Sequence, residues 1–447
     1  MKIHCIGIGG IGVSALAQYY LAQGYKVSGS DLVASEITSA LERKGITIFI
    51  GNSAEHITPD IDIVVHSPAV KPSNPEYHKA KSLGLTIKSY PKALGELTRR
   101  YFTIAVTGSH GKSTTTAMIG LVLIKAGLNP TVIVGTKLKE FGDNNFHMGN
   151  SRFLVIEACE YDDSFRHYSA DIAVITNIDK EHLDYFETME GVVEAFETFI
   201  EKLPKKSLLI ANRDDGYATA VAEKQNQRRV LYYSLRLQAQ KNQDIAVIAG
   251  KKDAAIIKQS LGIPGSHNVS NALAVLSVAR VLKISDEVTF KVFPQYHGSW
   301  RRFEVKEKRV NQRLVTIVSD YGHHPTEVIA TLKAAREKFP GKKIWCIFQP
   351  HQYQRTYYLM KDFVKLFKKV PVNQVIITDI YDVAGREEKK ISGEVSAQSL
   401  VKKVGKRTVI YLPTKEIPSY MQQRVKRGDV VVVMGAGDIY TLIDRLV

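Results

Sequence analysis

The stretch Thr107-Gly108-Ser109-His110-Gly111-Lys112-Ser113 follows the apolar run 102–106 and precedes a helix that we expect to begin near Thr114. In such a strand-turn-helix unit, successive backbone N–H groups surround phosphate oxygens, the lysine neutralises the β- and γ-phosphates, and the serine hydroxyl ligates Mg²⁺. The common spacing G-x-x-x-x-G-K-[ST] requires glycine where this chain has Val106, so the shorter form T-G-x-x-G-K-S is present. The stretch predicts a loop for ATP phosphates, and a plain glycine turn is the alternative.

Apolar runs alternate with helical stretches along almost the whole chain, which is the α/β pattern. The chain has 447 residues, more than the roughly 250 to 300 that one core supports. Two or three domains are therefore expected, with boundaries near residues 91–99 and 293–299. The runs expected to form strands are residues 2–7, 61–66, 102–106, 153–157, 172–177, 315–319, 344–349, 375–378 and 430–434.

Composition narrows the class of protein without choosing a function. The formal charge of +16 permits a nucleic-acid partner, an anionic small substrate or only a basic surface. The three cysteines form neither a disulfide framework nor a metal pattern, which favours a reducing cytoplasm. No run reaches the roughly 18 continuous apolar residues of a membrane span.

A second glycine-rich stretch, Gly7-Ile8-Gly9-Gly10-Ile11-Gly12, follows the first apolar run and precedes an Ala/Leu-rich helix. Its glycines let the backbone approach a diphosphate at the positively polarised start of that helix. Ser30-Asp31 follows the next strand, where an acid meets a ribose in dinucleotide-binding folds. A nucleotide-sugar site, the cofactor site of a dehydrogenase and a tight packing turn all fit this pattern.

Acidic groups stand at the ends of two later strands. Glu157-Ala158-Cys159-Glu160 ends one run, and Asn177-Ile178-Asp179-Lys180-Glu181-His182-Leu183-Asp184 follows the next. The carboxyl ends of parallel strands meet at the edge where open sheets bind ligands. Because Mg²⁺ prefers oxygen ligands, we expect Glu157 to share one ion with Ser113 and His182 to serve a second. A solvated acid or a hydrogen-bonded histidine is the alternative for each residue.

Polar motifs also concentrate in the last third of the chain. They are Arg301-Arg302-Phe303-Glu304, the stretch 320–327 and the stretch 349–356, and the last two follow apolar runs. Such concentration at successive strand ends predicts a ligand site, with surface loops as the alternative. Arg302 and Arg355 are candidates for binding an anion, because a guanidinium grips a carboxylate or phosphate at two points. Upstream, we expect His267 or Asn268 to cap a helix that carries Asn271 on its first turn.

Taken in order, these motifs resemble the Mur ligase family. The resemblance rests on T-G-S-H-G-K-S-T-T-T, N-I-D-K-E-H-L-D, H-N-V-S-N-A-L-A, R-R-F-E, D-Y-G-H-H-P-T-E and Q-P-H-x-Y-x-R-T, and it extends from residue 2 to residue 438. It implies an α/β protein of three domains. Residues 1–97 would form a Rossmann-like domain for a UDP-sugar, residues 98–297 a central P-loop ATPase-type domain with a mostly parallel sheet, and residues 298–447 a Rossmann-like domain that closes over an amino acid.

The resemblance also implies roles for individual residues. ATP would contact Gly108, Ser109, His110, Gly111, Lys112, Ser113, Thr114, Asn268, Asn271, Arg302 and Asp320. The UDP-sugar would contact Gly9, Gly10, Ile11, Gly12, Ser30, Asp31, His66 and Ser67. The amino acid would lie among Tyr321, His323, His351 and Arg355. Mg²⁺ would bind Ser113, Glu157 and His182, and the catalytic residues would be Lys112, His182, His351 and Arg355.

Within the family, the N-terminal glycine-rich stretch at residues 7–12 and D-Y-G-H-H-P-T-E favour the step that joins L-alanine to the carboxylate of UDP-N-acetylmuramate. The carboxylate would attack the γ-phosphate to give an acyl phosphate, and the amine would then displace phosphate. This implies ATP and Mg²⁺ as cofactors and a cytoplasmic monomer or homodimer with no membrane or nucleic-acid partner. Its product would serve peptidoglycan synthesis, and through it cell wall biogenesis, cell shape and cell division.

Two departures from the family pattern bear on this expectation. The family usually has arginine where this chain has Gln352, so Arg355 would grip the amino-acid carboxylate alone, and glycine and serine stay open beside alanine. Ser109 and Ser113 stand where threonine is commoner, and Ser113 keeps the hydroxyl ligand. The alternatives are another ligase of the family, such as a tripeptide-recycling ligase, and a nucleic-acid-stimulated ATPase. A dehydrogenase leaves the phosphate loop unexplained.

Lys112 gives the sequence its sharpest test. If the stretch 107–113 is a phosphate loop, Lys112→Ala abolishes turnover. From the sequence alone we expect this substitution to cause little loss of fold.

Overall fold

The computed structural model describes residues 1–241, 246–382 and 393–446. It divides into two compact units, which are described separately. The first comprises Met1–Asp179, Val193–Ala254 and Asn271–Val292, and the second comprises Lys180–Val192, Ala255–Ser270 and Phe293–Val447. Among the described residues, no helix has both the length and the apolar character that a bilayer crossing requires.

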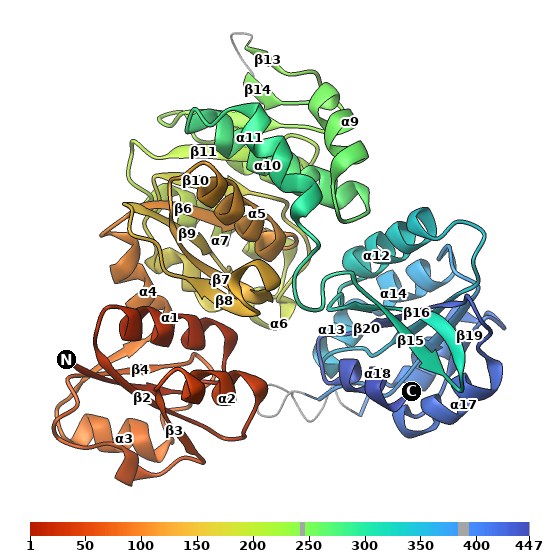
Figure 1. The fold of residues 1–447 in the computed structure, drawn as a ribbon, viewed down its shortest axis with the longest axis horizontal. Coiled ribbons are helices and arrows are strands. Elements are labelled where there is room, and N and C mark those ends of the chain that lie inside the picture. The colour runs from red at the N-terminus through yellow and green to blue at the C-terminus, as the bar shows by residue number, and fades with distance from the viewer. Residues whose placement is uncertain (242–245, 383–392, 447) are drawn as a thin grey trace. The chain divides into compact units, whose positions relative to one another are not determined.

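The first unit begins with a five-stranded parallel sheet in the order β3-β2-β1-β4-β5. Since the chain winds outward from β1 in both directions, right-handed crossovers put α1 and α2 on one face and α3 on the other (Figure 1). The elements are β1 (Lys2–Ile6), α1 (Ile11–Ala22), β2 (Lys26–Asp31), α2 (Glu36–Arg43), β3 (Thr47–Ile50), η1 (Ala54–His56), β4 (Ile63–His66), α3 (Pro75–Ser82), β5 (Thr86–Ser89) and α4 (Tyr90–Thr98).

A nine-stranded sheet follows in the same unit, in the order β13-β14-β12-β11-β10-β6-β9-β7-β8. It is parallel except at its two edges, where β13–β14 and β7–β8 pair antiparallel. Its strands are β6 (Phe102–Thr107), β7 (Thr131–Leu138), β8 (Asn144–His147), β9 (Phe153–Glu157), β10 (Ile172–Ile175), β11 (Leu208–Asn212), β12 (Val230–Tyr233), β13 (Gln240–Lys241) and β14 (Ala246–Ala249). Its helices include α5 (Lys112–Lys125), η3 (Tyr161–His167), α8 (Gly216–Glu223) and α11 (Asp286–Val292).

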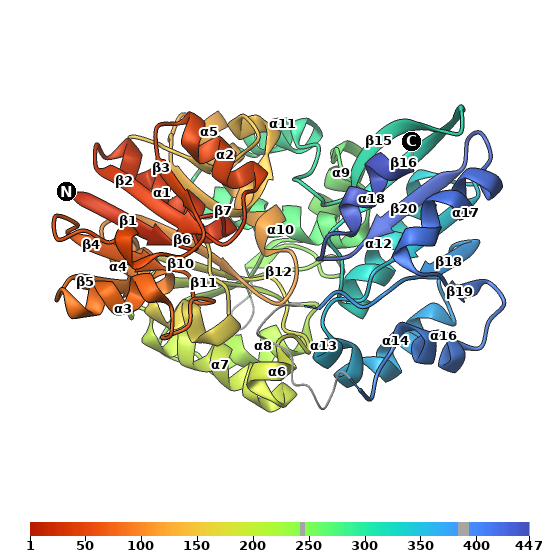
Figure 2. The same ribbon diagram turned by 90° about the horizontal axis from the view of Figure 1, so that it is seen from below.

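The second unit contains a six-stranded sheet in the order β15-β16-β20-β17-β18-β19, with the antiparallel hairpin β15–β16 at one edge (Figure 2). Its strands are β15 (Glu304–Val310), β16 (Arg313–Asp320), β17 (Ile344–Phe348), β18 (Gln374–Ile377), β19 (Val409–Tyr411) and β20 (Val430–Met434). Its helices are α6 (Leu183–Phe186), α12 (Pro325–Lys338), α13 (Tyr353–Tyr358), α14 (Met360–Phe367), α16 (Ala397–Val404), α17 (Ile417–Arg424) and α18 (Leu442–Arg445). Three helices contribute residues to both units, namely α7 (Met189–Lys202), α9 (Lys251–Ser260) and α10 (Ser266–Val281).

The central strand β20 shows how this sheet is covered. Its five residues, VVVVM, are all buried, as a parallel strand with helices on both faces requires. Val430, Val432 and Met434 pack into the core beneath α12 and α14. Val431 and Val433 pack into the core beneath α17 and α18, which lie on the opposite face (Figure 1). The side-chain alternation of the strand therefore serves two separate cores.

The sequence predictions agree with this fold in class and differ in detail. The α/β class and the mostly parallel sheets are confirmed, and each predicted run overlaps an observed strand. The helix after the phosphate loop begins at Lys112 rather than near Thr114, and the run 172–177 ends as a strand at Ile175. The predicted domain limits stay predictions, although residues 91–98 lie inside α4. Strand β15 was missed because its sequence, EVKEKRV, is charged and mostly exposed.

A buried acid ties the first sheet to α3. Glu76 is fully buried, and its carboxylate accepts a hydrogen bond from the Ser30 hydroxyl at 2.5 Å and contacts His56 Nδ1 at 2.8 Å and His4 Nε2 at 3.2 Å. Burial acts to raise the pKa of Glu76, but the hydrogen bonds of these three residues outweigh it and lower the pKa overall. The charged carboxylate is therefore the form that stabilises the fold.

We expect Glu76→Gln to lower the apparent unfolding temperature in scanning calorimetry by roughly 5 °C at pH 7, because it leaves a half-satisfied buried network. A carboxyl group whose pKa is lower in the folded state stabilises the fold fully above its unfolded-state pKa of about 4.3. This stabilisation is lost as the pH falls through the folded-state pKa. The difference from the parent protein should therefore shrink below about pH 4. Glu55→Gln, at an exposed position of η1, is the control. Equal effects of the two substitutions would contradict the network's role.

Candidate active site

The phosphate loop joins β6 to α5, and two of its glycines are required by its geometry. Gly108 and Gly111 have φ values of 130° and 84°, in the region that favours glycine. A Cβ at Gly108 would collide with the Thr176 hydroxyl, and one at Gly111 would collide with the Asn271 side chain. The loop therefore has the predicted place between strand and helix, and Asn271 packs directly against it.

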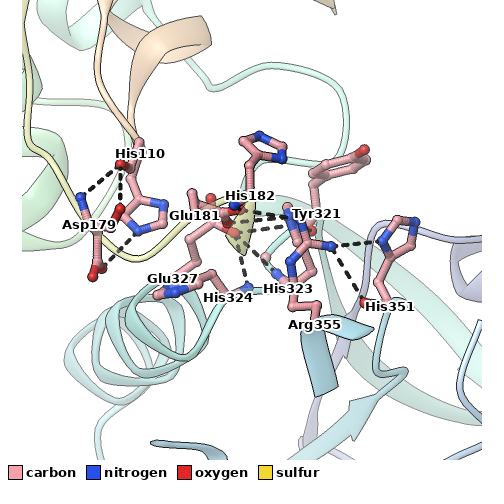
Figure 3. A network of polar contacts seen from close by, with 12 residues as sticks. His110, Asp179, Glu181, His182, Tyr321, His323, His324, Glu327, His351 and Arg355 are labelled. Atoms are coloured by element: carbon pink, nitrogen blue, oxygen red, sulfur yellow. Dashed lines mark hydrogen bonds and ion pairs between the residues drawn. The ribbon is translucent and has the colours of Figure 1, made fainter. Parts of the chain in front are cut away.

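The segment after β10 holds this loop in shape. The Asn177 side chain accepts from His110 N at 2.9 Å and donates to His110 O at 2.9 Å. Asp179 N donates to the Ser109 hydroxyl at 2.8 Å, and His110 Nε2 lies 3.1 Å from the Asp179 carboxylate (Figure 3). The first half of the N-I-D-K-E-H motif thus shapes the loop, a role that the sequence analysis did not assign.

Lys112 lies in the loop with its ammonium group fully engaged. Its Nζ donates to the carbonyls of Gly108 at 2.6 Å and Ser109 at 3.1 Å, and it lies 2.9 Å and 3.1 Å from the two carboxylate oxygens of Glu160. Burial acts to lower the pKa of Lys112, but the charge of Glu160 outweighs it and raises the pKa overall. Glu160 is 1% exposed. The sequence motif that contains Glu160 did not predict a role for it.

Two of the predicted metal ligands lie at the same sheet edge. Glu157 ends β9 and pairs in register with Val106 of β6, one residue before the loop begins. Its carboxylate accepts from Gly135 N on β7. Ser113 is the second residue of α5 and is 8% exposed. A carboxylate and a hydroxyl are the oxygen donors that Mg²⁺ prefers, so this pair fits the expected ion.

The other glycine-rich turn begins α1 and is closed by the strand next to it. Gly9 N donates to the Asp31 carboxylate at 2.8 Å, and Gly7 N donates to Ser30 O at 2.8 Å. The Ser30 side chain is fully buried and its hydroxyl is committed to Glu76, so only its backbone serves the turn. His66, at the end of β4, contacts the carbonyl of Ser67 at 3.0 Å.

In the second unit, Asp320 holds the R-R-F-E segment to the end of β16. Its carboxylate accepts from Phe303 N at 2.9 Å, from Gly322 N at 2.8 Å and from the Thr331 hydroxyl at 3.2 Å. Burial raises the pKa of Asp320. The Asp320 carboxylate therefore uses much of its hydrogen-bonding capacity within the protein. The resemblance implies that it also contacts ATP. Arg302 forms an ion pair with Glu327 at 3.4 Å.

Arg301, which the sequence analysis left without a role, is the more deeply buried of the two arginines. It is 4% exposed and donates to the carbonyls of Gly435 and, at 2.9 Å, Gly437. Its guanidinium also lies over the ring of Tyr440, 4.4 Å from the centroid. These contacts join the segment that carries Arg302 to the loop after β20.

Four of the predicted residues gather around one ion pair in the second unit (Figure 3). Arg355 Nη2 lies 3.2 Å from the carboxylate of Glu181, and both side chains are buried. Arg355 Nη1 donates to Gln352 Oε1 at 3.0 Å and contacts His351 Nδ1 at 3.1 Å. The ring of His323 lies 5.7 Å from that of His351, between centroids. The fourth predicted residue, Tyr321, stands edge-on to the His323 ring at 5.4 Å.

Glu181 completes this cluster, although sequence reasoning gave it no role of its own. Its other oxygen lies 3.7 Å from His323 Nε2. The pKa of Glu181 is held well below its usual range, because Arg355 and the neighbouring histidines outweigh its burial. Burial, aided by Arg355, lowers the pKa of His323 to about 4. The cluster therefore presents a carboxylate, a guanidinium and a neutral imidazole near pH 7.

One local prediction upstream was wrong. Helix α10 begins at Ser266, so His267 and Asn268 lie inside its first turn and neither precedes it as a cap. Asn268 instead donates through its side chain to the carbonyl of Pro264 at 2.7 Å. Gly265 precedes the helix, and its carbonyl accepts from Asn268 N at 3.0 Å and from Val269 N at 3.2 Å, which are backbone bonds of the first turn. His182, the predicted ligand of a second metal ion, directly precedes α6 as its N-cap residue, with a φ of 56°.

Three family profiles match consecutive parts of the chain. The Mur ligase family catalytic domain matches residues 2–102, the Mur ligase middle domain residues 106–279, and the Mur ligase glutamate ligase domain residues 301–437. A UDP-N-acetylmuramate–L-alanine ligase of Acetivibrio thermocellus is 41% identical over 98% of this chain and 94% of its own length. One of Aquifex aeolicus is 41% identical over 98% of this chain and 95% of its own length. The chain belongs to the Mur ligase family.

Solved Mur ligase structures share the fold. The UDP-N-acetylmuramate-alanine ligase MurC of Thermotoga maritima superposes with a TM-score of 0.79 and 27% identity, covering 100% of this chain and 98% of that one. A murein peptide ligase of Psychrobacter arcticus has a TM-score of 0.73 at 23% identity, with coverage of 100% and 98%. Membership in an ATP-dependent ligase family excludes the dehydrogenase and nucleic-acid-stimulated ATPase hypotheses as the main function.

The geometry changes one sequence-based expectation, because Lys112→Ala leaves the buried Glu160 without its cation. We expect the substitution to lower turnover at least 1,000-fold, roughly the effect of losing a transition-state charge contact. We also expect a lower unfolding temperature, since breaking a buried pair costs about 3–5 kcal/mol. Phosphate release and scanning calorimetry measure the two effects. Lys137→Ala, which loses a partly exposed pair with Glu36, is the control. A variant that is inactive yet as stable as the control would contradict the ion pair's structural role.

Proposed function

We propose that this chain joins L-alanine to the carboxylate of UDP-N-acetylmuramate and converts ATP to ADP and phosphate, the first peptide step of peptidoglycan synthesis. The observation that carries the chemistry is the phosphate loop, with its lysine and with Glu157 at the adjoining strand end. The two full-length relatives at 41% identity support the choice of substrates. The proposal includes a cytoplasmic location, Mg²⁺ as the metal, and a monomer or homodimer.

The first step activates the sugar carboxylate. Lys112 and the loop N–H groups that do not donate to Asn177 bind the terminal phosphates of ATP and neutralise the charge that spreads over the γ-phosphate during transfer. Mg²⁺ on Ser113 and Glu157 would add to this neutralisation when bound. The glycine-rich turn at Gly9–Gly12 binds the diphosphate of the sugar nucleotide at the start of α1. The carboxylate attacks the γ-phosphorus and ADP leaves, which gives an acyl phosphate.

The second step needs a free amino acid held by both of its charged groups. Arg355 grips the carboxylate, and its orientation is held by Gln352 and His351. Glu181 is the acid next to it and binds the ammonium group. Once that group has lost a proton, the amine attacks the acyl carbon, the amide bond forms and inorganic phosphate leaves. Neutral His323 does not compete with the ammonium for Glu181, since its pKa is about 4. The two charged groups of the amino acid thus bind Arg355 and Glu181, which form an ion pair with each other in the free protein.

The direct test measures phosphate release with UDP-N-acetylmuramate and ATP while the amino acid is varied. We expect release to require the sugar nucleotide and to be fastest with L-alanine, ahead of glycine and L-serine. Release that needs L-alanyl-γ-D-glutamyl-meso-diaminopimelate in place of alanine would indicate a murein peptide ligase instead. No release with the sugar nucleotide and any of these acceptors would refute the proposal.

Arg355→Lys tests the amino-acid site. We expect the KM for L-alanine to rise about 100-fold, because an ammonium group replaces a two-point guanidinium contact. The KM values for ATP and the sugar nucleotide should change less than about twofold. Lys361→Arg, at an exposed position of α14, is the matched control for exchange between the two cations. An equal rise in the KM for ATP would show that Arg355 serves the nucleotide instead.

A further inference from the structure

Lys112 and Glu160 form a closed arrangement in the described structure. A lysine ammonium has three N–H donors. Here they face two loop carbonyls and a carboxylate that approaches with both oxygens, at 2.9 Å and 3.1 Å. The lysine therefore has no donor left over for a phosphate while all these contacts persist. A nucleotide can reach the ammonium only by displacing one of its partners.

Glu160 is the partner that a phosphate replaces most readily. The carbonyls of Gly108 and Ser109 belong to the loop itself, whose shape is held by Asn177 and Asp179. Glu160 instead lies outside the loop, on the segment between β9 and η3, and its carboxylate pairs with Lys112 at 2.9 Å. Carboxylate and phosphate are both anions that accept from ammonium, so they compete for one site. Two such anions side by side also repel each other in a buried place.

We propose that Glu160 is the displaceable counter-ion of Lys112, which holds the lysine while the loop is empty and takes it back as ADP leaves. This inference rests on the proposed ATP-driven function, because it assumes that the loop binds and releases adenine nucleotides. Glu160 is then a positioning residue that acts through Lys112. It keeps the empty loop from carrying an uncompensated buried cation, and it limits the affinity for product.

The test is the affinity of the full chain for ADP, measured by titration calorimetry in EDTA so that no metal contributes. We expect Glu160→Gln to bind ADP about tenfold more tightly than the parent, because the competing charge is gone while the amide keeps the size of the side chain. Asp163→Asn is the matched control: it makes the same charge change in the adjoining η3, where Asp163 pairs with Arg166. We expect the control to change the affinity less than twofold.

Steady-state kinetics give a second readout that a purely structural role would not produce. In Glu160→Gln we expect ADP to inhibit about tenfold more strongly and kcat to fall, while the KM for ATP falls as well. A residue that only supports the fold would raise KM or leave it unchanged. Unchanged or weaker ADP binding in Glu160→Gln would overturn the inference. Tighter ADP binding in Glu160→Gln, together with no ligase turnover by the parent protein, would leave the inference standing and refute the proposed function instead.

A second pair of variants covers the case in which Glu160→Gln does not fold. The double variant Lys112→Met with Glu160→Met removes both charges at once. We expect it to unfold at a higher temperature than Lys112→Met alone, since no buried carboxylate is left without a partner. We also expect both to bind ADP equally weakly, because Glu160 acts only through the lysine. Weaker ADP binding in the double variant than in Lys112→Met would overturn the inference.

Discussion

The two hydrogen bonds between the Asn177 side chain and the backbone of His110 hold the phosphate loop open at the end of β6. Two N–H groups of the loop take part in this support, because Ser109 N and His110 N both donate to Asn177. The later N–H groups of the loop are therefore the ones left to bind phosphate. The segment that follows the neighbouring strand β10 supplies the partners, through Thr176, Asn177 and Asp179. The order of β10 next to β6 in the sheet is therefore a condition for the site, and the rest of the central sheet keeps these two strands in register.

The described parts of the chain also share one way of treating buried charge. Glu76, Glu160 and Glu181 are each at least 95% buried, and each lies within 3.2 Å of a cation or histidine. Such pairs contribute little net stability compared with apolar packing, but breaking them is costly. The pair in the first sheet joins elements of the fold. The pairs at Lys112 and Arg355 place a cation where an anionic substrate is expected, so the substrate can take over a contact that already exists.

Sequence reasoning succeeded where residue type and spacing determine local structure. The backbone conformation at positions 108 and 111 requires glycine, and the apolar run 102–106 before them forms the buried strand β6. It failed where a role depends on which strand lies next to which. Glu160 and Glu181 were quoted within motifs and given no function, because nothing along the chain shows that one meets Lys112 and the other Arg355. The predicted cap at α10 was wrong for a local reason, since the helix already begins at Ser266, before His267 and Asn268.

The sequence by itself determined the fold class, the position of the phosphate loop and the ligase family, because glycine conformations, apolar periodicity and motif order are properties of the chain alone. Only the tertiary structure decided which polar residues form hydrogen bonds within the fold and which orient other side chains. Ser30 turns inward to Glu76 and serves the turn by its backbone, Asp320 closes a loop, and Gln352 orients Arg355 where the family usually has a second arginine. The physical reason is that a hydrogen bond joins atoms close in space, and sheet order brings together residues far apart in sequence.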